Sequence, residues 1–194
     1  VGAIMIDNKT GAILGMIEGR DYFIEQLNHA TQMVRAPGSA MKPLAAYLPA
    51  LEDGSIQPAT VLDDTPIVLK DGGKGFHIPN NVNLKFNGLM TARHALNQST
   101  NTVAIKLFNN VVGIERAWNF VKTLGITTIE DSDYHAATGV IGGMARGVTV
   151  EEITNAYAAI ANYGEFVDAY LIEKITTLDG EVIYEHKVNP KRVF

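Results

Sequence analysis

The sequence predicts an α+β fold, because strand patterns at both ends of the chain enclose a longer stretch of helical patterns. Residues 1–6 and 12–17 are apolar runs on either side of the turn sequence DNKTG, and residues 170–186 alternate around LDG. Both patterns predict β-hairpins. Between them, segments with apolar residues at helical spacing end at glycines. We see no internal repeat.

The composition is that of a globular protein with a sizeable core. The chain has 194 residues, of which 46% are hydrophobic and 19% charged, enough for one domain with a small lobe at most. A net charge of −5 without any basic run argues against nucleic-acid binding. The apolar runs are shorter than the ~18 residues that a membrane span requires, and no signal-peptide pattern opens the sequence. Because cysteine is absent, disulfides and thiolate chemistry are excluded.

A helix is expected to begin at Ser39. The apolar residues that follow have the i, i+3, i+4, i+7 spacing of a buried stripe, and they are Met41, Leu44, Ala45 and Leu48. Pro43 is tolerated because it lies near the first turn, and Gly54 suits the end of the helix.

The rest of the chain predicts loops followed by more helices. Residues 55–90 carry three prolines and the DGGKG stretch, which predict loops with one short hairpin at most. Further helices are expected over residues 91–98, 101–112 and 114–124, the last two ending at Gly113 and Gly125. Thr149 opens a capping box with Glu152. The helix behind this box ends near Gly164 and is expected to bury Ile153, Tyr157 and Ile160.

Ser39 and Lys42 are candidate catalytic residues because they lie three positions apart on a predicted helix, about 5–6 Å apart at Cβ. A serine hydroxyl is a good nucleophile only when a base takes its proton, and lysine can be that base only if burial or a nearby cation lowers its pKa. The helix start adds N–H groups that stabilise a substrate oxyanion. The alternative is a serine cap on a surface helix with a solvated lysine, which is a common use of this spacing.

A second pair, Ser99 and Asn101, lies in NQSTNTV at a break between two predicted helices. A tight turn there can point both side chains into one cleft. Ser99 could then pass a proton between Lys42 and a leaving amine, and Asn101 could bind a substrate amide. The alternative is a capping pair that joins the two helices.

Together with their flanking sequences, these motifs resemble the transpeptidase domain of class A, bifunctional penicillin-binding proteins. The resemblance spans nearly the whole chain. It is carried by the stretches GAIMIDNKTGAILGMIEGRDY, NHATQMVRAPGSAMKPL, ALNQSTNTVAIKL, GVTVEEITNAYAAIANYG and IEKITTLDGEVIY. It implies a β-lactamase/transpeptidase-like fold, with a helical subdomain and part of an antiparallel sheet.

The resemblance also implies a serine-type D-Ala-D-Ala transpeptidase. Ser39 would be the nucleophile, Lys42 the general base and Ser99 the proton relay, while Asn101 would bind substrate. Attack on a peptidoglycan stem peptide ending in D-Ala-D-Ala would expel D-alanine, and an amine of a neighbouring stem would resolve the acyl-enzyme into a cross-link. A β-lactam antibiotic would mimic the dipeptide and stall as the acyl-enzyme. The family works at the extracytoplasmic face of the bacterial cell membrane, and no cofactor is expected.

The third motif of the family, Lys-Thr-Gly, is not in its expected place after the second hairpin. Lys9, Thr10 and Gly11 spell it, but they lie in the predicted turn of the first hairpin. The missing strand would supply an oxyanion N–H and the lysine that holds the substrate carboxylate, and losing one such donor costs about 10²–10³ in rate. We therefore expect residues 1–194 to be the N-terminal portion of an incomplete transpeptidase domain. Residues 1–194 alone would be inactive or impaired. The missing C-terminal part of the same domain would then be a binding partner, supplied as a second chain. The family's membrane anchor and glycosyltransferase domain also lie outside these residues.

Two other functions are compatible with the same motifs. A serine β-lactamase needs a further base to activate water, and Glu151 with Asn155 offers a carboxylate and an amide at i, i+4. In a capped helix, however, a capping glutamate and an exposed asparagine are expected there. A β-lactam-binding sensor or scaffold domain without turnover is the other alternative.

The remaining polar groups suggest no further chemistry. The five histidines show no ligand spacing, so no metal is expected. Asp63 with Asp64, and Asp131 with Asp133, are expected in solvated loops. LKDGGKGF lacks the P-loop spacing and predicts a hairpin turn. Trp118 is expected to pack in the core or at its rim.

Overall fold

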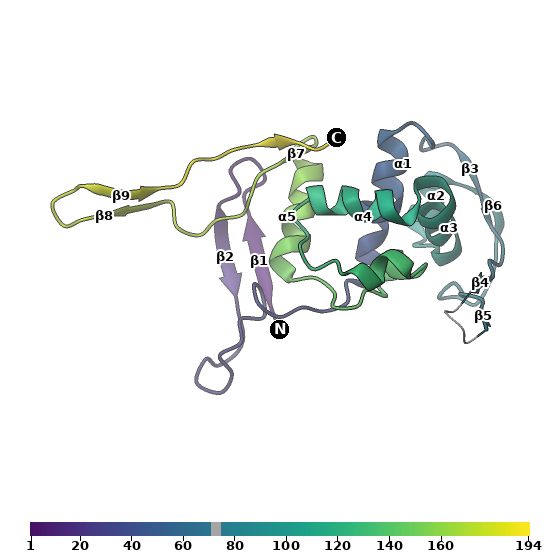
Figure 1. Ribbon diagram of the computed structural model, residues 1–194, viewed down its shortest axis with the longest axis horizontal. Coiled ribbons are helices and arrows are strands. Elements are labelled where there is room, and N and C mark those ends of the chain that lie inside the picture. The colour runs from purple at the N-terminus through teal and green to yellow at the C-terminus, as the bar shows by residue number, and fades with distance from the viewer. Residues whose placement is uncertain (71–74) are drawn as a thin grey trace. The chain divides into compact units, whose positions relative to one another are not determined.

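The predicted hairpins and helices are present in the computed structural model, which describes residues 1–70 and 75–194 (Figure 1). Its α-helices are α1 (Leu48–Glu52), α2 (Ala92–Asn97), α3 (Asn101–Lys106), α4 (Ile114–Thr123) and α5 (Val150–Ala161). Its strands are β1 (Ala3–Ile6), β2 (Ile13–Ile17), β3 (Val61–Asp64), β4 (Leu69–Lys70), β5 (Phe76–His77), β6 (Gly88–Thr91), β7 (Glu165–Phe166), β8 (Lys174–Thr176), β9 (Val182–Glu185) and β10 (Lys191–Arg192). The mixed fold is therefore confirmed. In the described part of the chain, no helix has the length and apolar character that crossing a bilayer demands.

The first of two structural units comprises residues 1–35, 122–128 and 148–194, and its β1–β2 hairpin lies beside α5 (Figure 1). β1 pairs antiparallel with β2, with Ala3 opposite Ile17. In the turn, Asp7 Oδ1 accepts hydrogen bonds from the backbone N–H groups of Lys9 and Thr10 at 3.0 and 2.8 Å. The Lys-Thr-Gly sequence at this position is therefore part of a turn, as predicted.

Helix α5 begins as predicted but buries a different face. Thr149 Oγ1 accepts from Glu152 N at 3.1 Å, which confirms the capping box. The expected buried face is wrong, because Tyr157 and Ile160 are 37% and 38% exposed and Ile153 is half-buried. The buried positions are instead Asn155, Ala156, Ala158 and Ala159, so the expectation of an exposed Asn155 is also wrong. Small side chains on this face let the helix pack closely against β1.

Two further strand pairs belong to the first unit. The hairpin predicted around LDG forms between β8 and β9, with Gly180 in its turn at a φ of 89°. The sequence did not predict the second pair, in which β7 lies antiparallel to β10.

The second unit comprises residues 36–121 and 129–147. The helical segment predicted from Ser39 starts with a 3₁₀ turn (Gly38–Ala40) and continues through a π-helical segment (Pro43–Tyr47) into α1. Gly54, at a φ of 77°, follows it. The predicted apolar stripe is buried except at Leu48, which is half-buried.

The other predicted helices of this unit are also present. Thr91 caps α2 by accepting from His94 N at 3.2 Å. The helix expected over residues 101–112 consists of α3 and a π-helical segment (Leu107–Val112), and Gly113 follows it at a φ of 86°. Short 3₁₀ turns occupy Asp131–His135 and Gly139–Ile141.

Trp118 lies in the core of the second unit, as expected. It is fully buried, its ring packs edge-to-face on Phe108 at 5.3 Å, and its Nε1 donates to Asp133 O at 3.0 Å. The expectation that Asp133 lies in a solvated loop is wrong, because this residue is 1% exposed. Its carboxylate accepts from the N–H groups of Glu130 and Ala145.

Residues 55–90 contain more strand than the sequence predicts. β3 pairs antiparallel with β6, and β4 pairs with β5, while the predicted turn at residues 71–74 lies outside the described residues. Asp63 and Asp64 therefore lie on a strand and not in a solvated loop. Since neighbouring side chains on a strand point to opposite faces, Asp63 is exposed and Asp64 is fully buried.

Candidate active site

Ser39 lies in the 3₁₀ turn that opens the first helical segment of the second unit, and it is exposed. The preceding Gly38 has a φ of 58°, which a residue with a side chain rarely adopts. Gly142 lies against this turn, and a Cβ at position 142 would collide with the backbone of Gly38. Sequence reasoning missed Gly142, because nothing in the local sequence relates it to the serine.

Lys42 is buried, which excludes the alternative of a solvated lysine. Its side chain is only 1% exposed, and burial lowers its pKa from 10.5 to about 8. No ion pair to Lys42 forms within the described residues. Instead, Nζ donates to Ser99 O at 2.5 Å, to Ser99 Oγ at 3.0 Å and to Asn101 Oδ1 at 2.6 Å. Because burial disfavours the charged amine, Lys42 loses its proton more easily than a lysine in water.

Ser99 and Asn101 reach Lys42 because of the break between α2 and α3. Ser99 has a φ of 53°, which is unusual for a residue with a side chain, and this conformation presents both its carbonyl and its hydroxyl to Nζ. The N-cap of α3 is Thr100, whose side chain makes no capping hydrogen bond. The capping-pair alternative is therefore wrong, since the side chains of Ser99 and Asn101 contact the lysine.

Three of the four candidate residues are thus brought together, and the fourth is placed one helical turn away along the chain. In the part of the chain that the structure describes, Ser39 Oγ makes no hydrogen bond to Lys42 Nζ. Of the groups that contact Nζ, a carbonyl oxygen and an amide oxygen can only accept, whereas the Ser99 hydroxyl can both accept and donate. Among these three contacts, only the Ser99 hydroxyl is able to exchange a proton with the lysine.

A hollow of about 460 Å³ opens beside Ser99. All but one of its lining residues carry polar side chains, and they are Asn81, Val82, Asn83, Asn87, His94, Gln98, Ser99 and Thr100. Amide side chains of this kind can donate to and accept from a peptide. The asparagines at 81, 83 and 87 could not be predicted from the sequence as lining residues, because no motif links them to Ser99.

The whole chain, residues 1–194, matches the sequence model of the family described as the penicillin binding protein transpeptidase domain. It is 36% identical over 185 residues to penicillin-binding protein 1A of Rickettsia bellii, covering 94% of this chain and 22% of the relative. Curated relatives such as this one are much longer, and the chain spans between 22% and 30% of their length.

Solved structures give the same result for the fold. The crystal structure of penicillin-binding protein 1A from Haemophilus influenzae superposes with a TM-score of 0.83 at 28% identity, over 96% of this chain and 27% of that one. The PonA1 protein from Mycobacterium tuberculosis, solved in complex with penicillin V, superposes with a TM-score of 0.80 at 22% identity, over 95% of this chain and 50% of that one. The expected β-lactamase/transpeptidase-like fold is confirmed.

Proposed function

The chain belongs to the penicillin-binding protein transpeptidase family, and from this premise we propose that it carries the acylation residues of a peptidoglycan D,D-transpeptidase. The observation that carries the proposal is the buried amine of Lys42, held by Ser99 and Asn101 one turn beyond the exposed hydroxyl of Ser39. A surface lysine would be protonated at neutral pH and could not take the proton of a serine.

In the proposed acylation, Lys42 acts as the general base for Ser39. With a pKa of about 8, roughly a tenth of the lysine is neutral at pH 7. Ser39 Oγ gives its proton to the lysine and forms a bond to the penultimate carbonyl carbon of a stem peptide ending in D-Ala-D-Ala. The bond from that carbon to the nitrogen of the terminal D-alanine breaks, and the leaving amine receives a proton through Ser99 Oγ.

The same groups serve the second half of the reaction. An amine from a neighbouring stem peptide forms a bond to the acyl carbon and gives one proton through Ser99 Oγ to Lys42. The bond from that carbon to Ser39 Oγ then breaks, and Oγ takes a proton back from Lys42. Asn101 Nδ2 donates one hydrogen bond to Asn80 O at 2.8 Å, which leaves its second N–H to donate to a substrate carbonyl. A β-lactam would acylate Ser39 in the same way, and its ring would prevent departure of the leaving group.

We further propose that turnover requires segments beyond these 194 residues, as a Lys-Thr-Gly strand would supply the second oxyanion donor. The chain alone is then inactive or impaired, and the remainder of the transpeptidase domain is its partner. The site of action is the extracytoplasmic face of the bacterial membrane, where peptidoglycan is built.

Covalent labelling with a fluorescent penicillin tests the proposal in the full-length protein. The wild type should be labelled at Ser39, Ser39→Ala should abolish the label, and Lys42→Ala should slow labelling by a factor of about 10² or more. Unchanged labelling of Lys42→Ala would contradict the role of the lysine. Asp63→Asn, on an exposed face of β3, is the matched control and should label at the wild-type rate.

The fate of the acyl-enzyme separates the proposed function from its two alternatives. A D-Ala-D-Ala peptide supplied together with an acceptor amine should give the cross-linked product. Release of a hydrolysed β-lactam within seconds would instead indicate a serine β-lactamase. Stable acylation without any transfer to the amine would indicate a sensor or scaffold domain.

A further inference from the structure

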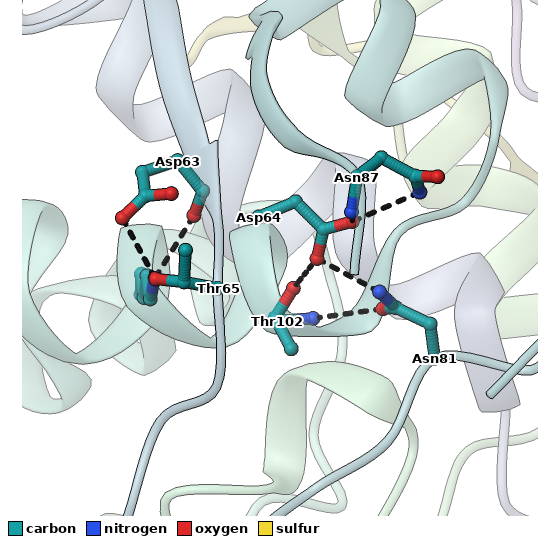
Figure 2. A network of polar contacts seen from close by, with 7 residues as sticks. Asp63, Asp64, Thr65, Asn81, Asn87 and Thr102 are labelled. Atoms are coloured by element: carbon teal, nitrogen blue, oxygen red, sulfur yellow. Dashed lines mark hydrogen bonds and ion pairs between the residues drawn. The ribbon is translucent and has the colours of Figure 1, made fainter. Parts of the chain in front are cut away.

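Asp64, at the end of β3, is a fully buried carboxylate, and no ion pair accompanies it in the described chain. It accepts a hydrogen bond from Thr102 Oγ1 and others from Asn81 Nδ2 at 2.8 Å, Asn87 N at 2.8 Å and Asn87 Nδ2 at 3.0 Å (Figure 2). An ionised carboxylate can only accept, so these donors satisfy both of its oxygens.

The carboxylate stays ionised in this environment. Burial raises the pKa of Asp64, but the hydrogen bonds from Thr102, Asn81 and Asn87 together outweigh burial and hold the pKa below its usual value. A buried charge without a cation is a poor way to stabilise a core, since an apolar side chain of similar volume would avoid the cost of desolvation. The explanation for Asp64 therefore lies with the residues that donate hydrogen bonds to it.

Asn81 links Asp64 to the start of helix α3. Its side chain is buried, and its Nδ2 donates both to Asp64 Oδ1 and to Lys85 O. These two acceptors fix the orientation of the amide, so that its Oδ1 accepts from the backbone N–H groups of Asn101 at 2.8 Å and Thr102 at 3.3 Å. The amide thus takes over the capping role that the side chain of Thr100 does not perform.

The start of α3 in turn sets the position of Asn101 relative to Lys42. Asn101 is held at its backbone by Asn81 and at its side chain by Asn80, whose carbonyl accepts from Nδ2 at 2.8 Å. With Nδ2 engaged there, Oδ1 faces the lysine at 2.6 Å. A continuous chain of hydrogen bonds therefore runs from the buried carboxylate to the catalytic amine.

We propose that Asp64 and Asn81 are positioning residues that hold Asn101, and through it the amine of Lys42, in the geometry needed for acylation. The proposal rests on the function proposed above for Lys42. Neither residue makes a hydrogen bond to Ser39 or Lys42 in the described chain, so both act through Asn101. An error of about 1 Å in such a placement can cost 10²-fold in rate.

The same strand provides a matched control. Asp63 precedes Asp64 but points to the exposed face of β3, where its carboxylate accepts from Thr65 Oγ1 at 2.7 Å (Figure 2). The same carboxylate lies 3.5 Å from Lys106 Nζ. Asp63→Asn removes one negative charge from β3, as Asp64→Asn does, but leaves the path through Asn81 to Asn101 intact.

The test measures the titration of Lys42 directly, by NMR of its labelled ε-methylene group in the full-length protein. Asn101 Oδ1 favours the protonated amine, so displacing this oxygen should lower the midpoint of the Lys42 titration. Asp64→Asn turns one acceptor into a donor that faces other donors, and we expect it to lower the midpoint by about one pH unit. Asp63→Asn should leave the midpoint where it is in the wild type.

Thr102→Val is the second variant, because it keeps the shape of the side chain and the charge of Asp64 while removing one hydrogen bond to it. It should lower the midpoint in the same direction by a smaller amount, and it keeps the test valid if Asp64→Asn does not fold. In penicillin labelling, both variants should reduce the maximal acylation rate, Asp64→Asn by about 10²-fold. Their acylation rate should also begin to rise at a lower pH than that of the wild type.

An unchanged Lys42 titration in the folded variants would overturn the proposal, as would an equal shift in Asp63→Asn. If Asp64 had a purely structural role, its variants would reduce the amount of folded, labelled protein but would leave the midpoint of the Lys42 titration unchanged. That result would also contradict the proposal. If the wild type is not acylated at all, the proposed function fails, but the NMR titration still decides whether Asp64 positions the lysine.

Discussion

Burial of Lys42 should make the stability of the protein depend on pH in a way that a single substitution removes. The pKa of this lysine falls from 10.5 to about 8 on folding. The folded state therefore holds the proton less tightly than the unfolded state, and the cost of burying the charge is fully present below pH 8. As pH rises from 8 to 10.5, the unfolded chain binds more protons than the folded one, and the free energy of unfolding should increase.

The size of the effect follows from the shift. Each pKa unit corresponds to about 1.4 kcal/mol, so the fall from 10.5 to about 8 corresponds to about 3 kcal/mol at neutral pH. Between pH 7 and pH 10, the wild type should recover about 2.5 kcal/mol of this relative to Lys42→Met, which carries no proton to lose. The variant also leaves oxygens of Ser99 and Asn101 without their donor. That loss lowers the free energy of unfolding of the variant at every pH. The test therefore compares how the free energy of unfolding changes with pH, and not its absolute value.

Urea unfolding followed by circular dichroism at a series of pH values measures this difference. Lys9→Met, which removes an exposed lysine from the β1–β2 turn, is the control for the loss of one positive charge, and its curve should follow that of the wild type. Curves for the wild type and Lys42→Met that stay parallel from pH 7 to pH 10 would refute the reasoning, because the lysine would then titrate alike in the folded and unfolded states.

Three further substitutions have expected outcomes. Tyr47→Phe removes a buried hydroxyl that has no hydrogen-bond partner in the described residues, so the free energy of unfolding in urea should rise by about 1 kcal/mol; a fall would point to a hidden partner. Ser99→Gly should relieve the positive φ by about 1 kcal/mol yet slow penicillin labelling at least tenfold, and equal labelling would exclude the proton relay. Thr149→Ala should cost about 1 kcal/mol in a thermal melt because it removes the cap of α5, whereas an unchanged melting temperature would show that the cap contributes nothing.

The features that could be predicted from sequence are those that depend on neighbours in the chain. Turn residues marked the β1–β2 and β8–β9 hairpins, glycines marked the ends of α4 and of the helical segments, and Thr149 with Glu152 marked the start of α5. The spacing of Ser39 and Lys42, and the break at Ser99, likewise identified the candidate site. Each signal involves residues within a few positions of one another.

The predictions that failed depend on residues distant in sequence. Asp64 was expected in solvent, but it is buried because β3 pairs with β6 and because Asn81 and Thr102, 17 and 38 positions away, supply donors to its carboxylate. The buried face of α5 was misjudged because close packing on β1 favours alanines over larger apolar residues. Local sequence patterns contain no information about which distant segment a strand pairs with or a helix packs against.

The amino-acid sequence by itself determined the family of this protein, its hairpins and helix ends, and the identity of its candidate catalytic residues. Only the tertiary structure decided that Lys42 is buried, that its amine contacts Ser99 and Asn101, and that hydrogen bonds of Asn81 link Asn101 to a buried carboxylate on β3. The physical reason is that the pKa of a side chain depends on desolvation and on the hydrogen-bond partners around it. Folding brings those groups together from positions up to 59 residues apart.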